Sequence, residues 1–402
     1  MIQKEFLQEI LKQQKEHLAH RDVGMLRDGL GSLPDIDNYA LIVSGVRRCG
    51  KSTLLYQLLK KSHTKTLYIN FDDPRLYDFE LSDFQKLDAL IKESENNVLM
   101  FDEIQIIKGW ERYVRQKLDE NYKIFVTGSN ASLLSRELGT SLTGRHITTE
   151  LFPFSYHEFC LFKHLEANKE SVIEYMRNGG FPEFLKTSSE EILANLLDDI
   201  LIRDIAVRYG IKDTRGLKRL TIYLLSNIGN LTSANKLREP SGLNSTTTVL
   251  EYLSHLEQSY LISLVPMFDY SLKKQAINPK KIYAIDLGLV NANVSKIKGD
   301  EGHKLENMVY NKLRSKFKEI YYHKGKVECD FIVLDKGTIT QAIQVCLQLD
   351  TDNKEREFAG LIDALKKYHL SEGIIVTLSQ DDIFEIDGFT IRLVPSFQFF
   401  NS

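Results

Sequence analysis

Apolar runs alternate with amphipathic stretches over the first third of the chain. Four runs have the length and composition of buried strands, at residues 40–43, 66–71, 98–101 and 123–127. Amphipathic stretches with helical spacing lie before and between these runs, at residues 1–20, 52–61, 84–93 and 111–119. Strands that alternate with helices are typical of a parallel sheet with helices on both faces. We therefore predict an α/β fold for this part.

The pattern changes after about residue 150. A helical stretch extends to about residue 204, and three helices are expected within residues 215–262. The second of these is short, and Pro240 and Gly242 separate it from the third. Two strand-like segments follow, at residues 261–268 and 281–285. Three helices and a hairpin predict a winged helix-turn-helix.

The last hundred residues alternate again. We expect helices at residues 303–317 and 354–368, and strands at 320–323, 327–334, 341–345 and 373–377. This order predicts a second, smaller α/β domain.

Composition narrows the class of protein. With 402 residues, 43% hydrophobic and 27% charged, the chain is expected to form about two to four folded domains. The net charge of −3 gives no global sign of nucleic-acid binding. The four cysteines lie far apart without CxxC spacing, which argues against a zinc site or a disulfide framework. No stretch approaches the roughly 20 apolar residues of a membrane span or resembles a signal peptide, so we expect a cytoplasmic protein without membrane contact.

The strongest motif follows the first strand. Residues 45–52 have the sequence GVRRCGKS, which fits the pattern GxxxxGK[ST] and opens a helix. We expect the loop to bind the phosphates of ATP through Gly45, Val46, Arg47, Arg48, Cys49, Gly50, Lys51, Ser52 and Thr53. Lys51 should reach the β- and γ-phosphates, and the Ser52 hydroxyl should bind Mg²⁺. A solvent-facing position is an equally open interpretation for Arg47 and Arg48.

Acidic and small polar residues follow the next buried strands. Asp102 and Glu103 end the strand at residues 98–101, and residues 127–130 have the sequence TGSN after its neighbour. Asp102 should hold Mg²⁺ through water, and Glu103 should polarise the attacking water. The adjacent glutamate favours hydrolysis over a kinase reaction. An acidic pair after a strand also suits a helix cap, the alternative interpretation.

The motifs described above resemble those of AAA+ ATPases: residues 45–52 resemble Walker A, Asp102 and Glu103 resemble Walker B, and residues 127–130 resemble sensor 1. Residues 142–145, 151–155, 157–159 and 179–183 resemble the AAA-type ATPases of the AAA_14 type that carry a carboxy-terminal DUF4143 domain. The resemblance implies that Asn130, or Ser129 before it, is the sensor and that Arg145 is a candidate arginine finger. A finger that acts in trans would require a homo-oligomer. The alternative for Arg145 is a surface arginine after a glycine turn.

The last domain resembles PD-(D/E)xK nucleases. Glu306 on the helix, Asp330 on one strand and Gln344 with Cys346 on the next occupy the positions of that motif. The chemistry needs two or three carboxylates for the metal and a lysine two residues after the last acid. Gln344 replaces that acid and Cys346 replaces the lysine, so we expect a degenerate site. Lys326 and Glu328 share a strand face with Asp330, so the alternative is a displaced nuclease site that these two residues restore.

The resemblance divides the chain into five parts. They are an amino-terminal helix (1–25), the ATPase domain (26–165), a helical connector (166–214), the winged helix (215–295) and the nuclease-like domain (296–402). The favoured hypothesis is an ATPase that couples turnover to DNA engagement; basic groups for the DNA would be Lys236, Arg238, Lys273, Lys274, Lys280 and Lys281. The alternatives are an ATP-dependent nuclease and a nucleotide-gated protein that binds protein partners.

Overall fold

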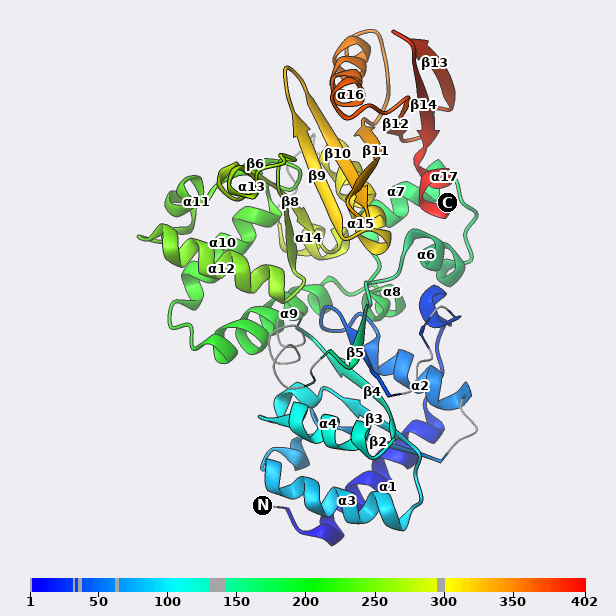
Figure 1. Cartoon of the computed structure of the whole chain (residues 1–402), viewed down its shortest axis with the longest axis vertical. Helices are drawn as coiled ribbons and strands as arrows, with labels where there is room; N and C mark the ends of the chain where they lie inside the picture. The colour runs from blue at the N-terminus through cyan, green and yellow to red at the C-terminus, as the bar shows by residue number, and fades with distance from the viewer. Residues whose placement is uncertain are drawn as a thin grey trace. The chain divides into compact units, whose positions relative to one another are not determined.

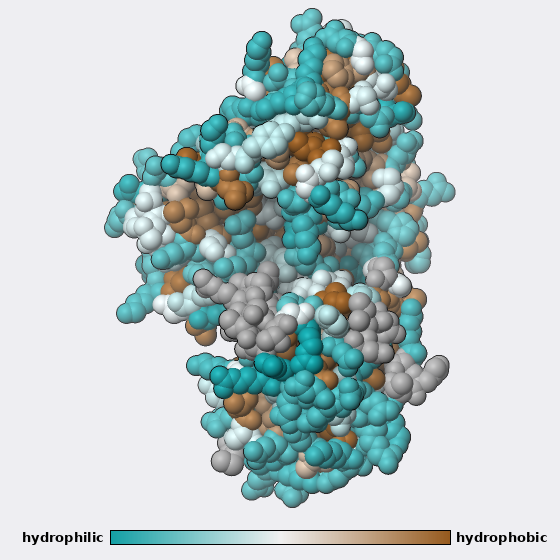
Figure 2. Space-filling model, in the orientation of Figure 1, coloured by the Kyte–Doolittle hydropathy of each residue, from teal (hydrophilic) through white to brown (hydrophobic). Residues whose placement is uncertain are grey.

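The structure is a computed structural model that describes residues 2–31, 33–34, 38–61, 65–130, 142, 144–294 and 301–402. It divides into two compact units, Met1–Leu151 and Phe152–Ser402 (Figure 1). Among the described residues, no helix combines the length and apolar character needed to cross a membrane. Hydrophilic side chains cover most of the face shown in Figure 2, with apolar residues in small patches.

The first unit is built on a five-stranded sheet in the order β2-β3-β4-β1-β5. All neighbouring strands are parallel. The strands are β1 (Ala40–Ser44), β2 (Thr66–Asn70), β3 (Val98–Asp102), β4 (Lys123–Gly128) and β5 (His146–Glu150). Four of them were predicted. The sequence HITTE of β5 was missed because this edge strand is only partly buried and lacks an apolar run.

Helices cover both faces of this sheet, which confirms the predicted α/β fold. One apolar cluster joins the sheet to α1 (Lys4–His20), α3 (Phe84–Glu93) and α4 (Trp110–Asp119). It contains alternate strand residues such as Ile42 and Phe101. Their neighbours Leu41, Val43 and Met100 are buried on the opposite face, where α2 (Lys51–Lys61) contacts β3 and β4. Because α1 contributes Leu7 and Ile10 to the cluster, it is part of the first unit.

The second unit begins with consecutive helices. They are α6 (Tyr156–Lys163), α7 (Lys169–Asn178), α8 (Pro182–Thr187), α9 (Glu190–Asp199) and a π-helix (Ile200–Val207). Capping boxes begin two of them: Ser155 pairs with Glu158, and Asn168 pairs with Ser171. These caps fix where the chain changes from the sheet pattern to the helical one.

A small antiparallel sheet follows, in the order β6-β8-β7. The elements in chain order are α10 (Thr214–Leu225), β6 (Leu231–Thr232), α11 (Ala234–Ser241), α12 (Thr246–Gln258), β7 (Ile262–Val265), α13 (Leu272–Ile277) and β8 (Lys280–Ala284). The second helix is longer than predicted and includes Pro240. The proline falls in the last turn of the helix, and Gly242 ends the helix with a φ of 69°.

The carboxy-terminal part contains a six-stranded sheet in the order β13-β14-β12-β11-β10-β9. The helices and strands of this part are, in chain order, α14 (Leu287–Asn293), α15 (Glu301–Lys316), β9 (Glu319–Lys324), β10 (Glu328–Asp335), β11 (Thr338–Val345), α16 (Lys354–Tyr368), β12 (Glu372–Thr377), β13 (Asp382–Ile386), β14 (Phe389–Pro395) and α17 (Ser396–Asn401). The hairpin β13–β14 and α17 were missed. The alternation in β13 and the turn at Asp387 and Gly388 are the signals that would have found the hairpin.

The two sheets of the second unit are hydrogen-bonded to each other after β7. The backbone N–H of Phe268 donates to Tyr322 of β9 over 2.8 Å, and Tyr322 donates to Pro266 over 3.1 Å. The Tyr322 hydroxyl donates to the carbonyl of Pro279 over 2.7 Å. These bonds hold the start of β8 close to β9 and β10.

Candidate functional site

The loop at residues 45–50 joins the carboxyl end of β1 to the amino end of α2. A Cβ atom added to Gly45 would lie 2.1 Å from the carbonyl oxygen of Leu151, so only glycine fits there. Gly50 has a φ of 107°, a conformation that side chains disfavour. The backbone N–H of Leu151 donates to Ser44 over 2.7 Å and fixes the segment behind the loop. The glycines of the motif are thus required by the geometry of the loop.

Lys51 lies buried beneath this loop. Its ammonium donates to the carbonyls of Gly45 and Val46, each over 3.1 Å. It also lies 3.7 Å from Oε1 of Glu103. The structure therefore brings together the lysine that follows β1 and the glutamate that follows β3.

Both carboxylate oxygens of Asp102 are held by hydroxyl groups. Oδ1 accepts from Thr127 of β4, and Oδ2 accepts from Tyr68 of β2 over 2.7 Å. The Ser52 side chain is also hydrogen-bonded to this carboxylate. Burial, and next the charge of Glu103, raise the pKa of Asp102. Ser52 and Asp102 thus present adjacent oxygen atoms, the donor type that Mg²⁺ prefers.

Glu103 adopts a left-handed backbone conformation with a φ of 55°. Its N–H donates to the Thr127 hydroxyl over 2.9 Å, so one threonine positions both acidic residues. The side chain of Gln105 donates to Glu103 Oε2.

Of the other residues predicted for the site, Ser129, Asn130 and Cys49 lie at the loop edge of the sheet, and Arg145 does not. Ser129 and Asn130 are buried directly after β4, whose end Gly128 is paired with Ser44 at the end of β1. Both therefore lie at the loop edge of the sheet. Within the loop, Cys49 is buried, and burial raises the pKa of its thiol.

The structure does not place Arg145 at this edge. It precedes β5, and its carbonyl accepts from the N–H of Ala40, the first residue of β1. Its guanidinium is 2.6 Å from Asp119 at the end of α4. Arg145 is thus at the amino ends of the strands, whereas the phosphate loop is at their carboxyl ends. Thr143, in the segment that carried the resemblance, lies outside the described residues.

Two arginines that sequence reasoning missed contact the loop from the segment after α1. Arg27 is buried and donates to the Cys49 carbonyl over 2.9 Å. Arg21 donates to the Thr53 hydroxyl over 3.3 Å. Gln57 of α2 donates to the carbonyls of residues 23 and 25 and holds this segment on the helix. Arg48 is exposed with a φ of 63°, and Arg47 is half-buried.

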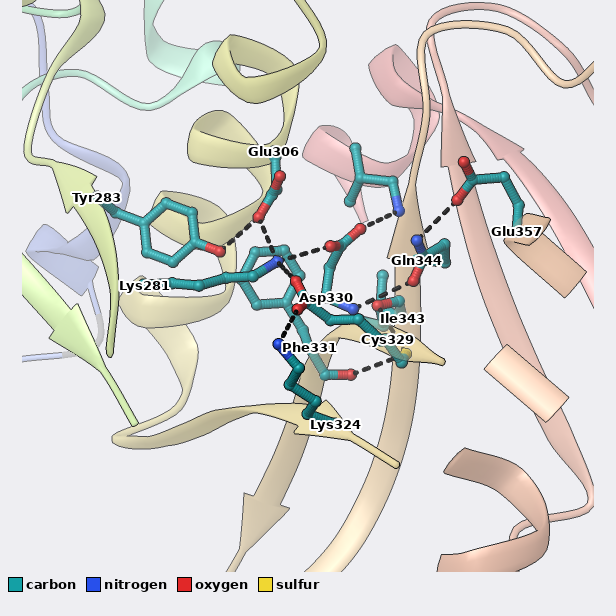
Figure 3. Close-up of polar contacts among 12 residues, drawn as sticks. Lys281, Tyr283, Glu306, Lys324, Cys329, Asp330, Phe331, Ile343, Gln344 and Glu357 are labelled. Carbon is teal, nitrogen blue, oxygen red and sulfur yellow. Dashed lines mark hydrogen bonds and ion pairs between the residues drawn. The ribbon is translucent and has the colours of Figure 1, made fainter. Parts of the chain in front are cut away.

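A second polar site lies in the second unit, between the two sheets (Figure 3). The ammonium of Lys281 is 2.8 Å from Asp330, 3.0 Å from Glu306 and 3.0 Å from Glu328. We call these three acidic residues the carboxylate cage. They come from α15 and β10, while Lys281 comes from β8. The structure thus brings the predicted Glu306 and Asp330 together around a lysine that was predicted to face DNA.

Gln344 supports the cage from β11. Its side-chain oxygen accepts from the N–H of Asp330 over 3.1 Å, and its amide donates to Glu357 over 2.7 Å. Cys346, the other replaced position, is buried, and burial raises the pKa of its thiol to about 12. Lys326, the expected source of a displaced lysine, precedes β10 and is exposed. The lysine that contacts Glu306, Glu328 and Asp330 is therefore Lys281 and not Lys326.

Burial sets the protonation of the cage. Burial, and next the charge of Asp330, raise the pKa of Glu306 to about 7, although Lys281 opposes the shift. The Tyr283 hydroxyl donates over 2.6 Å to Oε1 of Glu306, the oxygen that also contacts Lys281. The neighbouring carboxylates keep the pKa of Lys281 well above its usual value despite burial. A cavity of about 880 Å³ opens onto these residues.

Comparison with known proteins assigns the family. Residues 37–160 match the family model described as an AAA domain. An uncharacterized protein of Methanocaldococcus jannaschii is 36% identical over 376 residues, which cover 86% of this chain and 83% of that protein. The chain belongs to a family of AAA-domain proteins. An uncharacterized protein of Haemophilus influenzae is 30% identical over 386 residues, and these cover 89% of this AAA-domain protein and 93% of the Haemophilus protein.

Residues 169–301 of the AAA-domain protein match a domain of unknown function, DUF8612, where the sequence suggested DUF4143. Among solved structures, AMPPCP-bound DnaA from Aquifex aeolicus has a TM-score of 0.29 and 15% identity, over 62% of this chain and 88% of DnaA. PCH-2 of C. elegans has a TM-score of 0.25 and 16% identity, over 43% of this chain and 48% of its own.

Proposed function

We propose that this AAA-domain protein binds ATP with Mg²⁺ and hydrolyses it at the site formed by Lys51, Asp102 and Glu103. The observation that carries the proposal is the convergence of three strand ends. The loop after β1, the acidic pair after β3 and Thr127 at the end of β4 are joined by the contacts described above. This arrangement supplies cationic, acidic and hydroxyl groups next to a helix amino terminus, which is what phosphoryl chemistry requires.

The chain's own residues take distinct parts. Lys51 would exchange its two carbonyl partners for phosphate oxygens, and the loop N–H groups would hold the remaining negative charge. Ser52 and Asp102 would hold Mg²⁺, which neutralises charge that develops on the phosphates. Glu103, released from Lys51, would orient and polarise the attacking water. Asn130 or Ser129, buried at the same edge, would orient that water.

Nucleotide binding is testable by thermal unfolding. Mg²⁺-ATP at about 100 times its dissociation constant should stabilise the protein by roughly 2.7 kcal/mol. Lys51→Ala should lose most of this stabilisation, whereas Lys61→Ala, which removes an exposed lysine of the same helix, should keep it. Equal stabilisation of the two variants would contradict the proposed role of Lys51.

We further propose that turnover gates the engagement of DNA by the second unit. The order of α10, β6, α11, α12, β7 and β8, with an antiparallel three-stranded sheet, supports a winged helix in which α12 is the recognition helix. Ser245 caps α12 through the N–H of Thr247, and both are exposed at its start. Lys281 is removed from the predicted basic groups because it is buried in the carboxylate cage.

The DNA proposal makes a measurable prediction. The ATPase rate should rise on adding duplex, single-stranded or branched DNA, and binding should weaken steeply with salt because phosphate contacts release counterions. Lys236→Ala/Arg238→Ala on α11 should reduce binding, while Lys324→Ala on β9 serves as a control lysine. An unchanged rate with all three DNA forms would contradict it.

A protein partner is the second candidate for this unit. Exposed apolar side chains cluster around α13: Tyr270 is 84% exposed, Leu272 79% and Ile277 69%. Several exposed apolar side chains in one short segment suit a protein interface. If they bind a protein, replacing Leu272 and Ile277 by serine should abolish partner binding without changing the response to DNA.

A further inference from the structure

Lys281 is enclosed by the carboxylate cage. The residue is 2% exposed, and its ammonium touches an oxygen of each of the three carboxylates at 2.8 to 3.0 Å. These are the distances of charge-assisted hydrogen bonds. The three donors of an ammonium therefore match three acceptors that come from two other elements of the second unit.

We propose that the Lys281 ammonium is the built-in cation of the carboxylate cage and takes the position at which a divalent metal ion would otherwise bind. Removing the ammonium would turn the cage into a divalent-cation site. The proposal does not depend on the ATPase or on DNA engagement.

The dimensions of the cage suit an ammonium better than a metal. Ca²⁺ binds oxygen at 2.3–2.6 Å and Mg²⁺ at 2.0–2.1 Å, both shorter than the contacts to Lys281. No set of three or more acidic, histidine or cysteine side chains in the described part of the chain is arranged to hold a metal. While Lys281 is in place, the cage is therefore both filled and too wide. Ca²⁺ would require less contraction than Mg²⁺.

The carboxylates would stay oriented without the lysine. Asp330 Oδ2 accepts from the backbone N–H of Val345 over 2.9 Å. Glu306 accepts from the Tyr283 hydroxyl. The cavity that opens onto Glu306, Glu328 and Asp330 provides a path for an ion from solvent. A lysine-free cage thus has the acidic ligands, their support and access.

The arrangement also joins β8 to its neighbouring elements. An ammonium shared by three carboxylates ties the small sheet to β10 and α15 by charge as well as by the backbone bonds near Tyr322. Acids that neutralise this lysine are not available to a metal. The same feature therefore stabilises the second unit and makes it independent of divalent cations at this site.

The experiment compares Lys281→Met with Lys280→Met in the full chain without nucleotide. Methionine keeps the length of the side chain but removes its charge, and Lys280 faces away from the cage on the same strand. In EDTA, Lys281→Met should unfold about 10 °C below the wild type, because three buried carboxylates lose their cation. Millimolar Ca²⁺ or Mn²⁺ should restore most of this loss. Lys280→Met and the wild type should show neither effect.

Two further measurements identify the ligands. Lys281→Met/Asp330→Asn should not respond to either cation. Titration with Mn²⁺, followed by electron paramagnetic resonance, should find equal numbers of bound ions in the wild type and in Asp330→Asn. An additional wild-type ion that Asp330→Asn loses would overturn the proposal, even if Lys281→Met failed to fold. A folded Lys281→Met with no cation response would overturn it as well.

Discussion

The hydroxyl of Tyr68 donates to Oδ2 of Asp102 over 2.7 Å, across the neighbouring strands β2 and β3. Thr127 holds the other oxygen from β4. The carboxylate that we expect to hold Mg²⁺ is therefore fixed from both sides by groups that carry no charge. Its orientation depends on two residues that the P-loop motif does not include.

Tyr68→Phe tests this relationship. Loss of a hydrogen bond to a charged group corresponds to about 1.5–3 kcal/mol, so we expect ATP turnover to fall about tenfold or more and the Mg²⁺ requirement to rise. Tyr77→Phe is the matched control because that tyrosine of the same unit is 90% exposed. Steady-state hydrolysis at several Mg²⁺ concentrations measures both effects. Equal Mg²⁺ dependence in the two variants would mean that Tyr68 does not position Asp102.

Glu103→Gln separates binding from hydrolysis. Glutamine keeps the size of the side chain but cannot act as a base, so turnover should fall by about 10² to 10⁴ while ATP still stabilises the fold. Glu93→Gln, at an exposed position of α3, should behave like the wild type. Phosphate release and thermal unfolding are measured on the same samples. Hydrolysis at the wild-type rate would exclude Glu103 as the group that activates water.

Arg145 can reach a γ-phosphate only from another copy of the chain if it acts as a finger, since it is paired with Asp119 at the far end of the strands. Arg145→Ala should then lower turnover about 10³-fold or more. Mixing it with Lys51→Ala should restore part of the activity, because mixed oligomers contain sites with an intact loop and an intact finger. Sedimentation reports the oligomer. Full activity of Arg145→Ala would make it a structural arginine.

The pKa of Glu306 predicts the pH dependence of the second unit. The folded value of about 7 exceeds the ordinary value of 4.5, so the folded state binds the proton more tightly. Its contribution to stability is complete below about pH 4.5 and is lost as the pH rises through 7. Glu306→Gln mimics the protonated acid beside Lys281, Tyr283 and Asp330. The free energy of unfolding of Glu306→Gln, relative to that of the wild type, should rise by on the order of 3 kcal/mol between pH 5 and pH 8.

The test is a pair of unfolding curves measured across that pH range. Glu319→Gln, at an exposed position at the start of β9, is the control and should follow the wild type at every pH. A constant difference between Glu306→Gln and the wild type would show that Glu306 titrates at its ordinary value.

The phosphate site was predictable because its information is local. Residues 45–52 follow a buried strand without interruption, and Asp102 and Glu103 follow another, so parallel pairing brings them to one edge. Tyr68 was not found because a tyrosine in a half-buried strand has the pattern of an ordinary core residue. Nothing in the sequence indicated that the segment after α1 would bring Arg27 to the loop.

The carboxylate cage was only half predictable. Glu306 and Asp330 were identified, but Lys281 was expected to face DNA as one of a run of basic residues. The alternation along β8 puts Lys281 and Tyr283 on one strand face, and this was the available signal. The burial of that face depends on packing against α15 and β10, which follow β8 in the chain, and no local pattern determines it.

The central claim is that Lys51, Asp102 and Glu103 form an ATP-hydrolysing site. The most direct test is phosphate release from Mg²⁺-ATP by the wild type, Lys51→Ala and the surface control Lys61→Ala, each purified in the same way. We predict turnover that is lost in Lys51→Ala and kept in Lys61→Ala. Turnover that survives in Lys51→Ala, or that is absent from the wild type with and without DNA, would contradict the account.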